Sequence, residues 1–221
     1  HFASIVNWAT LVYHSGLPRV TPGKIMKLEN DYTRIKIGVM GSAGGLMEAV
    51  LVERCKEMGR AIADCGCAIV TGGCPGLPHH AVIGCKENGG LTVGVSPALS
   101  LHEHISKYKS PADHIDVLIF TGMGSMGREV IGVRSCDIVI TVGGRSGTLG
   151  EFAIAYDEGR LIGVLTGSGG VADHVDDFLP VMQKPTGSRI IYDRDPRKLI
   201  ERCVAEFRQN PSVIREHEAA I

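Results

Sequence analysis

One arginine and one glutamate bracket the most informative stretch of the sequence, residues 128–151. Arg128 opens a predicted helix at 128–136, and Glu151 stands in a second predicted helix that follows an apolar run at 138–142. The apolar run is short and rich in β-branched residues, as expected of a strand covered on both faces. A fixed guanidinium can clamp a phosphate, and a nearby carboxylate can stabilise positive charge. The alternative is an ion pair that only holds two helices together.

The turn between the strand and the second helix favours an anion. It contains three glycines, which let the backbone approach a ligand closely, and the first amides of the next helix point outward. A second glycine-rich turn, at 71–80, also leads from a strand into a helix and offers another set of amides. These turns predict a phosphate or nucleotide site formed by Gly41, Ser42, Gly72, Gly73, Gly76, Gly122, Gly144, Arg145, Ser146, Gly147 and Thr148.

From residue 34 onward, apolar runs alternate with helical patterns. This alternation predicts parallel strands joined by right-handed crossovers, which is an α/β, doubly wound, mostly parallel sheet of the Rossmann-like kind with helices on both faces. Ligands of such sheets bind beyond the carboxyl ends of the strands, where the glycines of this sequence gather. The predicted strands are 35–40, 67–70, 91–95, 115–120, 138–142, 161–165 and 190–192, with helices near 45–64, 77–88 and 196–208.

Length and composition indicate one domain. The 221 residues, 44% of them hydrophobic, are enough for a single well-buried domain at 34–221, preceded by an N-terminal extension at 1–33. Apolar residues between positions 5 and 13 need cover, so the extension is expected to dock on the domain or on a second subunit; a segment without fixed structure is the alternative. The net charge of -1 gives no basic footprint for nucleic acid.

Two further properties of the sequence bear on location. No apolar run approaches the ~20 residues of a membrane span, so no membrane association is predicted. The seven cysteines are odd in number and scattered through predicted helices, strands and turns. That distribution is typical of reduced thiols in a cytoplasmic protein rather than of a disulfide framework.

Several histidines, cysteines and glycines of the sequence could in principle bind a metal ion or a redox cofactor. Cys65 and Cys67 have the wrong spacing for a pair of zinc ligands. The Leu-His-Glu-His run at 101–104 could bind a metal, but it lies in a polar connection between strands. The pair His79-His80 suits a phosphate contact and a solvated helix start equally well. Residues 122–127 match the dinucleotide pattern GxGxxG, but they follow the fourth strand, and the next strand ends without an acidic residue for the ribose. We therefore predict no metal and no cofactor.

The motifs at 71–77, 89–95 and 144–151, together with Arg128 and Arg134, resemble the Lonely Guy superfamily over about residues 34–208. The resemblance implies a Rossmann-like nucleotide-binding fold and a homodimer or higher homo-oligomer with its site near a subunit contact. In the cytokinin-activating members it also implies hydrolysis of the N-glycosidic bond of nucleoside 5′-monophosphates. Their catalytic arginine and glutamate fall on Arg128 and Glu151, whereas Arg134, six residues along the helix, is expected to be structural.

The sequence departs from those enzymes at three positions of the motif. Gly143 stands where they have proline, Arg145 where they have glycine, and Gly150 where they have an acid. The resulting Gly-Gly-x-x-Gly-Thr form is closer to the molybdenum-cofactor carrier proteins, which bind a phosphorylated pterin without turning it over. Two functions therefore remain open: a phosphoribohydrolase, or a carrier or sensor of a phosphorylated small molecule.

Overall fold

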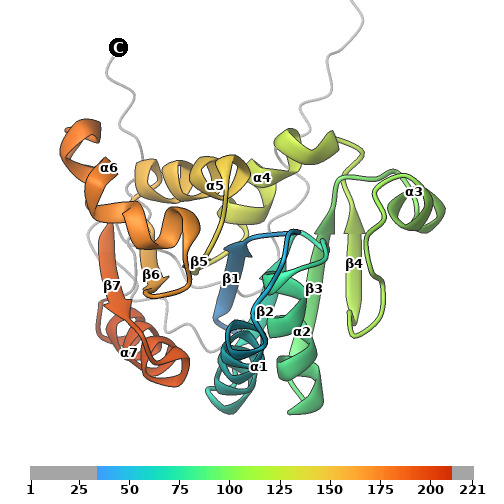
Figure 1. The fold of residues 1–221 in the computed structure, drawn as a ribbon, viewed down its shortest axis with the longest axis horizontal. Helices are drawn as coiled ribbons and strands as arrows, with labels where there is room; N and C mark the ends of the chain where they lie inside the picture. Colours follow the sequence, from blue (N-terminus) through green and yellow to red (C-terminus); the bar gives the residue numbers. More distant parts are fainter. Residues whose placement is uncertain (1–33, 211–221) are drawn as a thin grey trace, which may run out of the picture. The chain divides into compact units, whose positions relative to one another are not determined.

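A computed structural model describes residues 34–210 as a seven-stranded parallel sheet flanked by helices (Figure 1). The strand order is β4-β3-β2-β1-β5-β6-β7, and every pair of neighbours is parallel. The predicted Rossmann-like α/β class is confirmed, while the predicted extension at 1–33 lies outside the described residues. The strands are β1 (Lys36–Gly41), β2 (Ala68–Thr71), β3 (Leu91–Ser96), β4 (Val117–Phe120), β5 (Ile138–Val142), β6 (Leu161–Leu165) and β7 (Arg189–Asp193).

Helices form a layer on each face of the sheet. Helices α1, α2 and α7 share one hydrophobic core with the strands, and α4, α5 and α6 share the other. Among the described helices, none combines the length and apolar character that crossing a bilayer requires. The helices are α1 (Ala49–Asp64), α2 (Leu77–Glu87), α3 (Leu101–Ser106), α4 (Gly124–Arg134), α5 (Ser146–Asp157), α6 (Val175–Met182) and α7 (Pro196–Gln209), with a 3-10 turn, η2, at Gly170–His174.

Strand β5 shows why the sequence looks uniformly apolar where the sheet is central. All five of its residues are buried. Ile138 and Ile140 pack into the core beneath α1, α2 and α7, whereas Val139 packs into the opposite core. Because both faces of the strand are covered, both sets of alternating side chains are hydrophobic.

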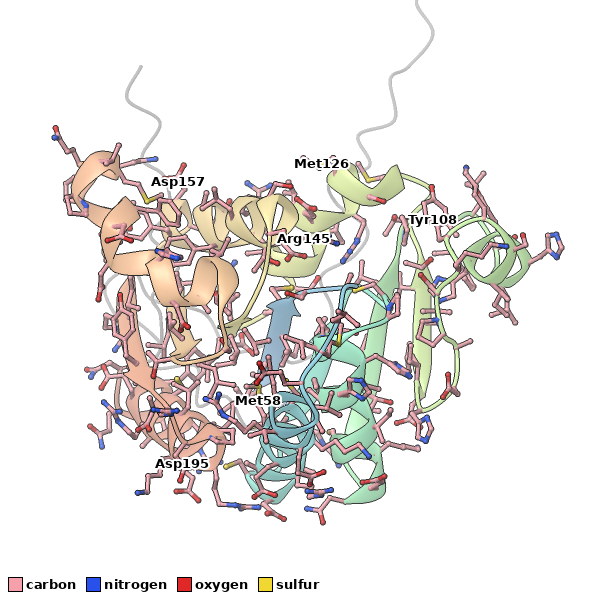
Figure 2. The ribbon with its side chains drawn as sticks, viewed as in Figure 1. Met58, Tyr108, Met126, Arg145, Asp157 and Asp195 are labelled. Atoms are coloured by element: carbon pink, nitrogen blue, oxygen red, sulfur yellow. The ribbon has the colours of Figure 1, made fainter. Side chains whose placement is uncertain are left out.

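The connection order places a crevice at the centre of the sheet. β1 pairs with β2 on one side and with β5 on the other, so the loop after β1 and the loop after β5 lead to helices on opposite faces. The carboxyl ends of β1 and β5 therefore form the topological switch point, where ligands of doubly wound sheets bind. Figure 2 shows Arg145, Met126 and Tyr108 toward one end of the fold, with Met58 and Asp195 toward the other.

Several predicted boundaries differ from the structure. The polar connection after β3 contains a short helix, α3, which begins where the Ser100 hydroxyl accepts the amide of Glu103. The strand predicted at 115–120 begins only at Val117, where the pairing with Val93 of β3 starts. Just before it, Asp116 bonds to Thr92 through both its amide and its carboxylate. The helix predicted from residue 45 begins at Ala49.

The helices do not cover the whole sheet. β4 is an edge strand, and its Val117, Ile119 and Phe120 remain 46%, 47% and 39% exposed. Leu99 and Met123, which flank this strand in the neighbouring loops, are also exposed. The predicted helices on both faces are confirmed, and the edge strand β4 is the part of the sheet that they leave partly exposed.

Candidate functional site

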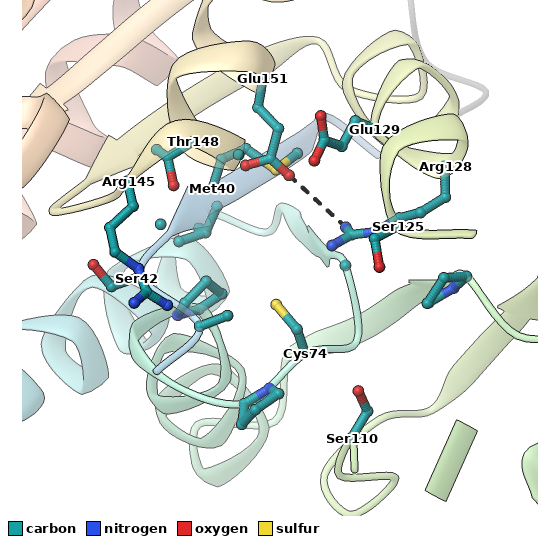
Figure 3. A pocket seen from close by; sticks show the side chains of 18 of the residues that line it. Met40, Ser42, Cys74, Ser110, Ser125, Arg128, Glu129, Arg145, Thr148 and Glu151 are labelled. Atoms are coloured by element: carbon teal, nitrogen blue, oxygen red, sulfur yellow. Dashed lines mark ion pairs between the residues drawn. The ribbon is translucent and has the colours of Figure 1, made fainter. Parts of the chain in front are cut away.

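A cavity of about 550 Å³ opens at the carboxyl ends of β1 and β2 and at the first turns of α4 and α5 (Figure 3). Arg128 and Glu151 both line it, as the sequence predicted for one cation and one carboxylate facing a common site. Seven of the eleven predicted binding residues also line it. They are Gly41, Ser42, Gly72, Arg145, Ser146, Gly147 and Thr148.

The loop between β5 and α5 is fixed by side chains from other loops. Gly143 and Gly144 have φ angles of 56° and 102°, a backbone region that glycine adopts without strain. The Gly144 amide donates to the Ser42 hydroxyl and the Gly143 amide to the Ser168 hydroxyl, each at 2.8 Å. These two hydrogen bonds fix the backbone conformation of the loop where it enters α5.

The start of α5 presents free donors to the cavity. The first hydrogen bond of its helical ladder runs from the Leu149 amide to the Arg145 carbonyl. The amides of Ser146, Gly147 and Thr148 precede that bond, so they have no partner within the helix. Arg145 is exposed at the same rim of the cavity. Amides, hydroxyls and a guanidinium together make this helix start suited to an anion.

Arg128 lies directly over the backbone of Gly72. A methyl group added at Gly72 would sit 1.8 Å from Arg128 Nη1, so glycine is required for the guanidinium to occupy this place. Arg128 Nη1 is 3.8 Å from Glu151 Oε1, a charge pair longer than a hydrogen bond. The buried Arg128 Nε has no acceptor among the described residues. Because the pairing with Glu151 is long, the end of the guanidinium that lines the cavity can also donate to an anionic ligand there.

The carboxyl of Glu151 is strongly perturbed. Burial raises its pKa to about 7, against the lowering effect of Arg128 and with a further rise caused by Glu129. Burial also raises the pKa of Glu129, again opposed by Arg128. Figure 3 shows these three side chains converging on one side of the cavity, opposite Arg145 and Ser42. A carboxyl with a pKa near 7 can exist in either protonation state at neutral pH.

Four predicted binding residues do not line the cavity. A Cβ atom added at Gly73 would contact the His104 side chain, and one added at Gly122 would contact the Leu99 side chain. Gly76 lets the β2–α2 loop approach the backbone of Ser42, since an added carbon would sit 2.2 Å from the Ser42 carbonyl oxygen. Gly144 faces the Thr148 side chain. These glycines shape the loops around the cavity.

Other lining residues were not predicted. Glu129 and Ser125 come from the first turns of α4, and Cys74 comes from the β2–α2 loop. Tyr108 and Ser110 come from the α3–β4 connection, which the sequence analysis treated only as polar. The available signals were that Ser125 belongs to the glycine motif at 122–127 and Cys74 to the glycine-rich turn at 71–80.

The other residues considered as functional candidates from the sequence have structural roles. Arg134 pairs with Glu158 at 2.6 Å, outside the cavity. His104 is buried between the Ser96 hydroxyl and the Pro111 carbonyl, so the run at 101–104 is engaged in packing and hydrogen bonding. All seven cysteines are free thiols, and burial raises the pKa of Cys67 to about 11.

A parallel Rossmann-like sheet with a cavity at its switch point defines the class of protein to which this chain belongs. Within that class, residues 34–200 match the model of the SLOG cluster4 family, and the chain belongs to that family. The predicted membership of a Lonely Guy-like superfamily is thereby confirmed. An uncharacterized protein from Archaeoglobus fulgidus is 34% identical over 131 residues, which cover 59% of this chain and 80% of that protein.

Solved structures are similar over nearly their whole length. The X-ray structure of TM1055 is 25% identical, with a TM-score of 0.67, over 79% of this chain and 99% of that one. The molybdenum cofactor binding protein from Rippkaea orientalis is 28% identical, with a TM-score of 0.64, over 79% and 98%. The molybdenum cofactor carrier protein from Chlamydomonas reinhardtii is 28% identical, with a TM-score of 0.62, over 78% and 99%.

The DNA processing protein A from Helicobacter pylori shares the fold alone. It is 17% identical, with a TM-score of 0.54, over 79% of this chain and 82% of that one.

Proposed function

We propose that the protein binds a phosphorylated small molecule in this cavity, with the phosphate at the start of α5. The observation that carries the proposal is the set of unpaired donors there: the amides of Ser146, Gly147 and Thr148, and the Arg145 side chain. Arg128 supplies a second cation across the cavity, with a buried Nε that lacks an acceptor among the described residues. The long, 3.8 Å pairing of Arg128 Nη1 with Glu151 leaves the end of the guanidinium able to donate to a ligand oxygen that enters the cavity.

Similarity to molybdenum cofactor binding and carrier proteins favours a carrier that holds its ligand without turning it over. The ligand class would then be a phosphorylated pterin. Cys74, Pro75 and Pro78 also line the cavity and offer surface against which a flat heterocycle could pack. The glycine loop at 122–127 contributes only Ser125 to the lining, which gives little support to a dinucleotide redox enzyme.

A phosphoribohydrolase is the second candidate, and the pairing of Arg128 with Glu151 favours it. Hydrolysis of a nucleoside monophosphate adds water to the anomeric carbon while the bond to the base nitrogen breaks. Positive charge develops on the sugar, and an ionised Glu151 would stabilise it and orient the water. Arg128 would hold Glu151 ionised and aimed, or would bind the phosphate.

One pair of measurements separates these two functions. Binding of inorganic phosphate, AMP and GMP is measured by calorimetry on wild type and Glu151→Ala, and release of free adenine or guanine is followed by chromatography. The hydrolase predicts base release by wild type that Glu151→Ala abolishes. The carrier predicts phosphate-dependent binding with no release above background. Absence of any phosphate-dependent binding would contradict both.

We also propose that the protein forms a homo-oligomer through the edge of the sheet. The support is the apolar surface that β4 exposes through Val117, Ile119 and Phe120. An exposed apolar edge strand of this kind is usually paired with, or covered by, another chain segment. Tyr108 and Ser110 lie in the connection that leads into β4 and also line the cavity. A subunit contact here would therefore stand close to the site.

We place the protein in the cytoplasm. The support is the chemistry of its thiols: seven cysteines are present, five of them buried, and all are free. Free thiols in this number are typical of a reducing compartment.

A further inference from the structure

Three side chains from two separate segments meet beside the cavity rim. His79 lies in the first turn of α2, and Asp113 and His114 lie in the connection between α3 and β4. One potential ligand atom from each residue lies within 4.8 Å of the others. Asp113 Oδ2 is 2.8 Å from His114 Nδ1 and 3.6 Å from His79 Nε2, and the two imidazole rings meet edge to face at 6.2 Å.

These separations match those of ligands around one metal ion. In a tetrahedral zinc site the bonds to nitrogen and oxygen are ~2.0–2.2 Å long, which places neighbouring ligand atoms roughly 3.3 Å apart. The two separations from Asp113 bracket that distance, and the two imidazole nitrogens lie within 4.8 Å of each other. Side-chain rotation that brings the imidazoles closer together would place all three atoms around one ion. Two imidazoles and one carboxylate are also a ligand set that zinc and similar divalent ions accept.

The backbone holds the three residues in place. His114 has a φ of 62°, in the left-handed region that residues other than glycine seldom adopt. Its carbonyl accepts the Thr92 hydroxyl of β3 at 2.7 Å. Two residues later, the Asp116 carboxylate accepts the Thr92 amide at 3.0 Å. His79 is largely enclosed, with 12% of its side chain exposed. The α3–β4 connection is therefore anchored to β3, and the His114 imidazole contacts His79 of α2.

We propose that His79, Asp113 and His114 bind one divalent transition-metal ion, with zinc as the best-fitting chemistry. Three protein ligands leave a fourth position for water or another small ligand. The ion would join the first turn of α2 to the α3–β4 connection. Pro78 and Ser110, which belong to these same two segments, both line the cavity. The metal would thus fix two parts of the cavity rim relative to each other.

Sequence spacing does not reveal this site, because the rest of α2, one strand and one helix separate position 79 from positions 113 and 114. The prediction of no metal rested on Cys65, Cys67 and the run at 101–104, and it did not consider Asp113 and His114. A metal-free explanation of the same geometry exists: the Asp113 carboxylate would accept a hydrogen bond from His114 and pair with a protonated His79. Binding measurements distinguish the two.

The test uses the full chain without a purification tag, freed of metal by a chelator. Titration with Zn²⁺ in a calorimeter is expected to give one site per chain. Titration with Co²⁺ is expected to give visible absorption of a four-coordinate ion without the near-ultraviolet thiolate charge-transfer band. The second measurement matters because the chain carries seven free cysteines, which are competing ligands.

Two variants remove ligands while preserving the backbone. His114→Asn keeps a residue that tolerates the left-handed conformation, and His79→Gln keeps a similar shape. Each is expected to weaken Zn²⁺ binding more than about 100-fold, since even indirect partners of a metal site contribute ~10–100-fold. His102→Gln, an exposed histidine on α3, is the matched control and should bind as wild type does.

Circular dichroism confirms that each variant is folded. Wild-type binding that persists unchanged in both folded variants would overturn the proposal, as would a cobalt spectrum dominated by thiolate ligation. No stoichiometric binding by wild type would also overturn it.

Discussion

Replacing Glu151 with glutamine tests the electrostatics of the cavity. Burial raises the pKa of Glu151 from its ordinary value of 4.5 to about 7 in the folded protein. Between these two pH values the folded chain keeps a proton that the unfolded chain releases, so the free energy of unfolding falls as pH rises from about 4.5 to about 7. The loss is complete above pH 7, where both states are deprotonated.

The expected size of the effect follows from the same shift. One pKa unit corresponds to ~1.36 kcal/mol, so a rise from 4.5 to about 7 corresponds to about 3 kcal/mol. Glutamine carries no proton to release. The stability of Glu151→Gln relative to wild type should therefore increase by about 3 kcal/mol between pH 4.5 and pH 8. The neighbouring Glu129 also has a raised pKa, but it is present in both proteins.

Urea unfolding at a series of pH values measures this difference. Glu201→Gln, an exposed carboxyl on α7, is the matched control and should track wild type throughout. A difference between wild type and Glu151→Gln that stays constant with pH would refute the account of a buried, perturbed carboxyl. A difference that grows toward low pH would show that Glu151 is stabilised in its charged form.

Three further substitutions probe other parts of the account. Gly72→Ala should displace the flexible Arg128 guanidinium and weaken phosphate binding in calorimetry, with a change in unfolding free energy below about 1 kcal/mol; unchanged binding would contradict the close packing of these two residues. Arg145→Ala should weaken AMP binding about tenfold, because a charge-assisted hydrogen bond contributes ~1.5–3 kcal/mol, and should leave adenosine binding unchanged. Ile119→Lys should give a monomer in sedimentation where wild type gives an oligomer. The control Val181→Lys changes an exposed apolar residue on α6 and should leave the oligomer intact. Oligomers that persist in Ile119→Lys would exclude the β4 edge as the contact.

The fold could be predicted because its local signals agree. β-branched apolar runs such as 138–142 fit only buried strands, and the glycines that follow them mark the carboxyl end of the sheet. Strand boundaries were less predictable. Ile115 belongs to the apolar run before Phe120, but the ladder begins at Val117, opposite Val93 of β3. The position at which the neighbouring strand begins to pair is not visible in the local sequence.

The candidate site was predicted where its residues are local and missed where they are brought together by topology. Arg128 and Glu151 flank one strand, so their spacing placed them at the same sheet end. Tyr108 and Ser110 reach the cavity only because the α3–β4 connection folds back beside α2. Gly73, by contrast, was predicted to bind ligand but faces His104, because a glycine motif does not reveal which way each backbone unit turns.

The central claim is that the start of α5 binds phosphate. A crystal structure of the protein soaked with GMP tests it most directly. The account predicts a phosphate group within hydrogen-bonding distance of the amides of Ser146, Gly147 and Thr148, with the Arg145 guanidinium beside it. A nucleotide bound with its phosphate away from these amides, or density for GMP only outside the cavity, would contradict it.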